Sequence, residues 1–356
     1  MALRPRPTIK PWLPKVWRDH ETLQIGIDPT DGVLVSGVNA ATAIWLTGLD
    51  GSRTEAETLA DAEAVGLDIA TAVRVLSGLS RSGVLLSTPI DTQNLGDTGA
   101  LLPELVSLIA AHASPLDGGQ ALTARSRLHI VIDGANRIGV PLGALLAASG
   151  VGRLSFLDAE YVRLCDAGVG GLSLEDEGEP RVSAAQHALR RISAMDQSRT
   201  VASPQEADLL ILCQPWSAHD PLQARGLSDR TAHLAVAVRD GTVVIGPLVL
   251  PGRTSCLRCA EMHRTDRDSR WPAVAAQLVA APNRAVHEPT NVLSTLAAAL
   301  AAGQVLDHLD GTRVPDVLEA TMELRPPDWQ LHRRPWPPHA DCGCLETSTE
   351  HARVAG

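Results

Sequence analysis

Four of the six cysteines stand in two closely spaced pairs. Cys256 and Cys259 form a CxxC turn, and Cys342 and Cys344 form a CxC turn further along the chain. Four thiolates satisfy the tetrahedral coordination that a closed structural Zn²⁺ site requires. We therefore predict one structural zinc ion that ties the C-terminal segment to the domain, with His339 as a reserve ligand. A redox-active or disulfide-bonded pair is the alternative.

A glycine-rich turn follows an apolar run that predicts a buried strand over residues 128–132. The turn reads Gly134-Ala135-Asn136-Arg137-Ile138-Gly139. A helix is expected over residues 140–148 and a second strand over 154–157, which Asp158 ends. This order of strand, turn, helix, strand and acid is typical of a nucleotide-binding βαβ unit.

The acid after the second strand is placed to accept hydrogen bonds from ribose hydroxyls, with Glu160 in support. The candidate nucleotide-binding residues are therefore Gly134, Asn136, Arg137, Gly139, Asp158 and Glu160. A site for NAD(P) or FAD is an alternative interpretation, since an acid in this position suits the ribose of NAD. The GxGxxG fingerprint of such sites is interrupted at Asn136, which disfavours it.

Several motifs beyond the turn resemble the ThiF family, the adenylating fold shared with ubiquitin-activating enzymes. They are Gly150–Asp158, Gly246-Pro247, Pro251-Gly252 and Cys256–Cys259. The resemblance covers residues 127–345 and implies a Rossmann-like α/β domain with a mainly parallel sheet. The segment Pro338–Cys344 is most similar to the ThiF-like proteins that accompany peptide cyclodehydratases.

The resemblance implies attack of a carboxylate on the α-phosphate of ATP, with Mg²⁺ held by an Asp. The sequence departs from the family at the residues for this step. Asn136 and Arg137 replace the inner glycines, and residues 168–171 stand where an Arg-Gln pair is expected. Arg181 is the nearest counterpart of a family Lys, and Gln214-Pro215-Trp216 follows the next strand in place of an Asp. No lysine occurs after Lys15, so no lysine ammonium is available to the domain.

Residues 20–88 have the pattern of a winged helix. Strands are expected over 22–27 and 32–37, and a closing strand over 83–86. Helices are expected over 40–46, 54–64 and 68–80, with Thr54 and Glu57 as a capping box. This unit resembles PqqD-like peptide-recognition domains in Leu49–Thr54, Leu79, Gly83 and Leu85, which implies that a leader peptide adds a strand to its sheet edge. A winged helix that is only a structural appendage is the alternative.

The formal net charge of −10 over 356 residues argues against nucleic-acid and anionic-membrane partners. The longest apolar stretch, residues 292–305, is too short and too mixed to span a bilayer. The N-terminus has no apolar secretion signal, so we expect a cytoplasmic protein with reduced thiols. Cys165 and Cys213 are expected to be plain buried thiols. Asp166 and the Gly-rich segment 168–179 are expected to form a solvated crossover loop.

The predicted organisation has five parts. They are an N-terminal extension (1–19), the winged-helix domain (20–88), a linker with a helix (89–126), the ThiF-like domain (127–345) and a disordered tail (346–356). The leading hypothesis is a homodimeric partner protein that binds a leader peptide and docks a YcaO-type cyclodehydratase, with a degraded adenylation site. The alternative is an active ATP- and Mg²⁺-dependent enzyme that adenylates the C-terminal carboxylate of a peptide or carrier protein, with Arg181 as a candidate catalytic residue.

Overall fold

The computed structural model of the chain describes residues 6–29, 32–86, 96–112, 115–193, 207–213, 231–280 and 289–345. The chain divides into two units, Met1–Leu122 and Thr123–Gly356. The tail predicted over 346–356, and Gln214-Pro215-Trp216, lie outside the described residues.

The N-terminal unit holds two small antiparallel sheets. In the first, β1 (Thr8–Ile9) pairs with β5 (Leu85–Leu86), and in the second the order is β2 (Lys15–Trp17), β3 (Thr22–Ile25), β4 (Val33–Ser36). The structure therefore differs from the predicted extension over residues 1–19, because β1 and β2 are part of the unit. Strands of two or three residues carry too short an alternation to be read from sequence.

Three helices complete this α+β unit, and each begins at a side-chain cap. They are α1 (Ala40–Thr47), α2 (Glu55–Ala64) and α3 (Ile69–Arg81). Asn39 accepts from the Thr42 amide, and Thr54 forms the predicted capping box with Glu57, which confirms that prediction. Leu46 on α1, Ala72 on α3 and Ile25 on β3 are fully buried in the core of the unit.

The segment predicted as a linker contains more structure than one helix. It comprises a 3₁₀ helix, η1 (Gly96–Leu101), and two α-helices, α4 (Leu102–His112) and α5 (Pro115–Arg125). Ile109 and Leu105 form a small core with Leu86, against which Leu122 packs. α5 is not predicted from the sequence, because Gly118-Gly119 resembles a break in a helix. A Cβ on Gly118 would lie 2.7 Å from Ile109 Cγ1, so glycine there permits close contact with α4.

The second unit is built on a seven-stranded sheet in the order β12-β11-β10-β9-β8-β6-β7. The strands are β6 (His129–Asp133), β7 (Arg153–Leu157), β8 (Leu209–Leu212), β9 (His233–Arg239), β10 (Thr242–Val249), β11 (Ala320–Arg325) and β12 (Gln330–Pro335). β7, β6, β8 and β9 are parallel, and β10 to β12 continue the sheet in antiparallel pairs. Five of the seven strands thus run in one direction, which confirms the mainly parallel Rossmann-like sheet.

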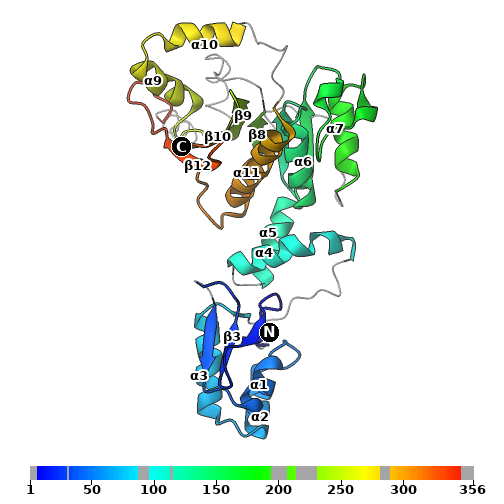
Figure 1. Cartoon of the computed structure of the whole chain (residues 1–356), viewed down its shortest axis with the longest axis vertical. Helices are drawn as coiled ribbons and strands as arrows, with labels where there is room; N and C mark the ends of the chain where they lie inside the picture. Colours follow the sequence, from blue (N-terminus) through cyan, green and yellow to red (C-terminus); the bar gives the residue numbers. More distant parts are fainter. Residues whose placement is uncertain are drawn as a thin grey trace, which may run out of the picture. The chain divides into compact units, whose positions relative to one another are not determined.

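Helices cover both faces of this sheet (Figure 1). α6 (Gly139–Ala148), α7 (Arg181–Arg190) and α11 (Asn291–Asp310) enclose the larger core with Ile130, Phe156 and their neighbours. α9 (Leu257–Arg267), which α10 (Trp271–Ala280) follows, packs through Leu257 on the opposite face with Val131 and Ala235. The sheet is therefore buried on both sides, as the apolar strand sequences require.

α11 is the core helix of the second unit. Within the described part of the chain it is the one helix long and apolar enough to cross a membrane by length and composition. Its residues Ala297, Ala298 and Ala301 are fully buried against the sheet and α6. Thr290 caps it by accepting from the Leu293 amide. Asn291 is engaged elsewhere, in the site described next.

Candidate functional site

The glycine-rich turn joins β6 to α6 at the carboxyl edge of the parallel strands, where α/β proteins bind ligands. Gly134 has a φ of +114°, and a Cβ there would lie 2.7 Å from the carbonyl oxygen of Cys213. A Cβ on Gly139 would collide with the carbonyl oxygen of Gly134. The backbone packing thus explains both outer glycines without any ligand.

The Asn136 side chain closes the turn on itself. Its Nδ2 donates to the Cys213 carbonyl at 2.6 Å, and its Oδ1 accepts from the amides of Ile138 at 3.0 Å and Gly139 at 3.1 Å. Those amides lie at the N-terminus of α6, where a phosphate would otherwise be expected to bind. Asn136 therefore occupies the donors that an inner glycine would leave open.

Arg137 connects the turn to two distant segments. Its Nη1 donates to the Cys165 carbonyl at 3.0 Å, and its Nη2 donates to Oδ1 of Asn291. Cys165 belongs to a short 3₁₀ helix, η2 (Leu164–Asp166), and its side chain is exposed. The prediction that Cys165 is buried is thus wrong, whereas Cys213 is buried as expected. Burial also raises the pKa of the Cys213 thiol, so it stays protonated and unreactive.

Asp158 follows β7, where the sequence places it, but its carboxylate already has partners. Its Oδ2 accepts from the Ala135 amide at 2.9 Å and its Oδ1 from the Glu160 amide at 2.9 Å. Arg181 Nη1 lies 3.5 Å from Oδ2. Glu160 is exposed, and its carbonyl accepts from the Arg181 amide. The structure therefore brings the predicted residues together, with Asp158 bound to the glycine-rich turn and to Arg181.

Arg181 lies buried between two carboxylates. Its Nη2 and Nε donate to Oδ2 of Asp166 at 2.7 and 3.1 Å, opposite the contact with Asp158. Asp166 also accepts from the amide and the guanidinium of Arg163 at 2.8 and 3.0 Å. Burial by itself raises the pKa of Asp166, but the hydrogen bonds from Arg163 and Arg181 outweigh it, so the pKa is held below its usual value.

Asp166 therefore differs from the solvated acid that the sequence analysis expected. It is 1% exposed, and the segment that follows forms a second 3₁₀ helix, η3 (Leu174–Asp176). The sequence signal that could have found it is the pair of Arg163 and Asp166 three residues apart, the pattern of a side-chain cap at a helix start.

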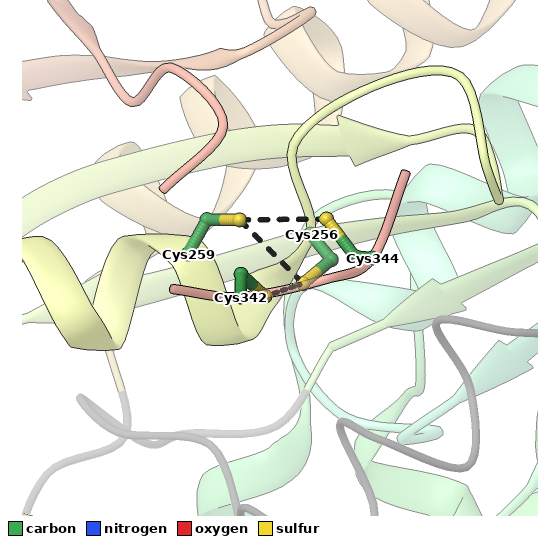
Figure 2. Close-up of side chains that lie close together, drawn as sticks. All are labelled: Cys256, Cys259, Cys342 and Cys344. Atoms are coloured by element: carbon green, nitrogen blue, oxygen red, sulfur yellow. Dashed lines mark hydrogen bonds between the residues drawn. The ribbon is translucent and has the colours of Figure 1, made fainter. Parts of the chain in front are cut away.

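The four paired cysteines converge, two from the start of α9 and two from the C-terminal segment (Figure 2). The Sγ–Sγ distances are 3.8 Å for Cys256–Cys259, 3.5 Å for Cys256–Cys342 and 3.5 Å for Cys259–Cys344, and none is a disulfide. A tetrahedral Zn²⁺ with Zn–S bonds of about 2.3 Å places sulfurs ~3.8 Å apart. The cluster could therefore hold a zinc ion.

The surroundings of the cluster favour bound thiolates. Cys256 is the residue before α9, so its sulfur lies at the positive end of the helix. The amide of His339 donates to Cys259 Sγ at 3.3 Å. The His339 ring, the predicted reserve ligand, instead binds Asp266 through Nε2 at 2.9 Å. His339 is thus placed to support the cluster through its backbone.

The glycine-rich turn, the acid after β7 and the four-cysteine cluster stand in one domain with the topology described above. A model of the ThiF family matches residues 111–345. This chain belongs to the ThiF family. No curated protein has a sequence that matches the chain.

Solved structures share the fold along nearly the whole chain. A structure of E. coli MccB with AMPCPP and selenomethionyl MccA superposes with a TM-score of 0.70 at 14% identity, covering 95% of this chain and 99% of that one. MccB with ATP gives 0.68 at 14% identity, covering 95% and 99%. Selenomethionyl PaaA gives 0.65 at 15% identity, covering 92% and 99%. At these identities the similarity establishes the fold.

Proposed function

We propose that this ThiF-family protein is the peptide-binding partner of a peptide-modifying enzyme, with an adenylation site that its own side chains close. The N-terminal unit would bind the leader of a precursor peptide, and the second unit would dock a YcaO-type cyclodehydratase that brings its own ATP site. The observation that carries this proposal is the position of Arg181, buried between Asp158 and Asp166.

Adenylation requires positive charge that is free to meet the developing charge on the phosphates. Arg181 is paired with two acids, and Arg137 donates to Cys165 and Asn291. Asn136 takes the amides at the start of α6. In the arrangement observed Arg181 is thus held by two carboxylates, and Arg137 is held through both Nη atoms, with Nε of Arg137 left without a hydrogen bond among the described residues.

A peptide partner is supported by the similar structures and by the N-terminal sheet. Microcin C7 biosynthetic enzyme MccB has been solved in complex with N-formylated MccA. In this chain β4 pairs only with β3 in the described three-stranded sheet, so its outer edge can accept a further strand. Leu34 on β4 is half-exposed, beside the backbone that such a peptide would pair with.

An active adenylating enzyme is the second candidate function. It is favoured by the match to MccB solved with ATP over 95% of this chain, and by the position of Asp158 directly after β7. In this case Asp158 would bind the ribose of ATP, and Mg²⁺-ATP would draw Arg137 and Arg181 from their present partners. The substrate would be the C-terminal carboxylate of a peptide or carrier protein.

Two measurements separate the candidates. ATP–pyrophosphate exchange, measured with candidate peptides as acyl substrates, is expected to stay at background for the partner protein. Exchange that is lost in Arg181→Met but kept in Arg190→Met, an exposed arginine on the same helix, would establish the enzyme instead.

Peptide binding is tested separately, by fluorescence anisotropy with the labelled leader peptide. Leu34→Glu is expected to weaken binding at least several-fold, because it places a charge beside the β4 edge. Ile44→Glu replaces a similarly exposed apolar residue on α1 and should leave binding unchanged. Absence of binding by the unaltered protein, in anisotropy and in a pulldown, would refute the peptide-binding role under both candidates.

A further inference from the structure

Arg239 ends β9 on the carboxyl side of the parallel strands, and its charge has no partner in the described part of the chain. Its Nε is buried without a hydrogen bond, and no ion pair joins the guanidinium to a carboxylate in the described ranges. The residue as a whole is partly exposed, so a ligand can reach the guanidinium. A buried N–H without a partner costs free energy, and a ligand that accepts from it would remove this cost.

Two of the acids near Arg239 are already bound to other donors. Glu261 on α9 accepts from Arg264, and its second oxygen accepts from Nε1 of Trp271 at 2.5 Å. Glu323 on β11 accepts from Arg334 through both oxygens, at 2.8 and 3.0 Å.

The sheet register places Glu323 and Arg239 on the same face. Ala237 and Glu323 both pair with Val244, and Arg239 follows Ala237 by two residues. Asp240 is exposed in the turn after β9, and no ion pair joins it to Arg239. Both acids on this side of the sheet, Glu261 and Glu323, are thus held by other donors, and Arg239 has no ion pair within the described ranges.

Other cations and two tryptophans surround the unpaired arginine. The Arg264 guanidinium lies 4.9 Å from the Trp336 ring centroid and 5.7 Å from that of Trp271, and Arg267 lies 4.6 Å from Trp336. Burial, and next the charge of Arg264, lower the pKa of Arg239 to about 10. A bound anion such as a carboxylate would relieve the repulsion between Arg239 and Arg264.

We propose that Arg239 anchors a carboxylate-binding site at the end of β9, which takes an acidic side chain of the bound peptide. The proposal rests on the proposed function in that a peptide carries the carboxylate. The planar guanidinium matches a carboxylate in two parallel hydrogen bonds. β9 is parallel to β6 and β7, so Arg239 and the glycine-rich turn both lie at the carboxyl ends of the parallel strands, on the same side of the domain.

The test uses the full-length protein and sodium glutarate as the carboxylate probe. Glutarate is titrated against sodium chloride at constant ionic strength while the melting temperature is recorded. The unaltered protein should gain about 2–4 °C, since ligand binding to the folded state alone stabilises it. Arg239→Gln should show no gain, and Arg190→Gln, which replaces an exposed arginine on α7, should respond like the unaltered protein. In chloride alone Arg239→Gln should melt no lower, because it removes an unpaired charge.

A second variant guards against misfolding of the first. Arg334→Gln releases Glu323, whose carboxylate can then pair with Arg239, so the response to glutarate should fall. Equal responses of the unaltered protein and Arg239→Gln, or no response in either, would overturn the proposal. So would a gain with sodium phosphate and none with glutarate. Because glutarate binding needs no leader peptide, this result is independent of the peptide-binding test above.

Discussion

Replacing Asp166 by asparagine tests whether Arg181 has a structural role or is held ready to bind phosphate. The Asp166 side chain is fully buried and Arg181 is nearly so, so the variant leaves a buried guanidinium with only the longer contact to Asp158. Breaking a buried ion pair costs about 3–5 kcal/mol. The side-chain amide that replaces the carboxylate still accepts one hydrogen bond, and Arg163 is half-exposed, so we expect a value near the lower end.

Differential scanning calorimetry of the full-length protein measures this loss in the unfolding of the second unit. A cost of about 3 kcal/mol corresponds to a fall of roughly 6–12 °C in melting temperature. Asp176→Asn is the matched control. Asp176 caps η3 through the Ser173 amide at 2.7 Å, as Asp166 caps η2 through Arg163, but no arginine ion pair is described for it. Asparagine and aspartate are equally good capping residues, so the free energy of unfolding of the control should fall by no more than about 0.5 kcal/mol.

A double variant completes a double-mutant cycle for the Asp166–Arg181 ion pair. Arg181→Met combined with Asp166→Asn removes the buried cation as well, and an apolar side chain of similar volume is tolerated in such positions. The double variant should therefore melt higher than Asp166→Asn alone. If Asp166→Asn and Asp176→Asn instead melt within about 2 °C of each other, Arg181 does not depend on Asp166, and the site is not closed by this ion pair.

Three further predictions concern metal content, pH and the C-terminal end of α11. The purified protein should contain one zinc per chain by elemental analysis, and Cys259→Ser, which removes the most buried of the four thiols, should lose it. Hydrogen bonds hold the pKa of Asp166 in the folded protein below its usual value. Asp166 therefore contributes fully to the free energy of unfolding above the unfolded carboxyl pKa of about 3.9. This contribution is lost as the pH falls through the pKa of the folded state. An acid titration should therefore destabilise the unaltered protein more steeply than Asp166→Asn. Asp310→Asn breaks a buried bidentate pair with Arg125, at 2.6 and 2.7 Å, and should cost about 3 kcal/mol; a loss below about 1 kcal/mol in denaturant unfolding would contradict this.

The strand, turn and helix that begin the Rossmann-like domain could be read from the sequence because their signals are local. An apolar run predicts β6, and Gly139 is required by a contact with Gly134 inside the next turn. Thr54 and Glu57 likewise reveal the start of α2, since both partners of a capping box lie within one turn. The four cysteines predict a zinc site by residue type and spacing, and the fold brings their sulfurs within bonding range of one ion.

Features set by contacts between distant segments could not be read in this way. β1 finds its partner in β5, far along the chain, and α5 tolerates its glycines because α4 packs against them. The sequence predicts Asp166 in a solvated loop, and only the folded structure shows that Arg181 lies beside it.

The sequence by itself thus determined the family resemblance, the order of the elements and the residues of both candidate sites. Only the tertiary structure decided which charges are paired: Arg181 with two acids, and Arg239 with none among the described residues. The physical reason is that pairing depends on distances and burial between residues far apart in the chain, which residue type and spacing do not encode.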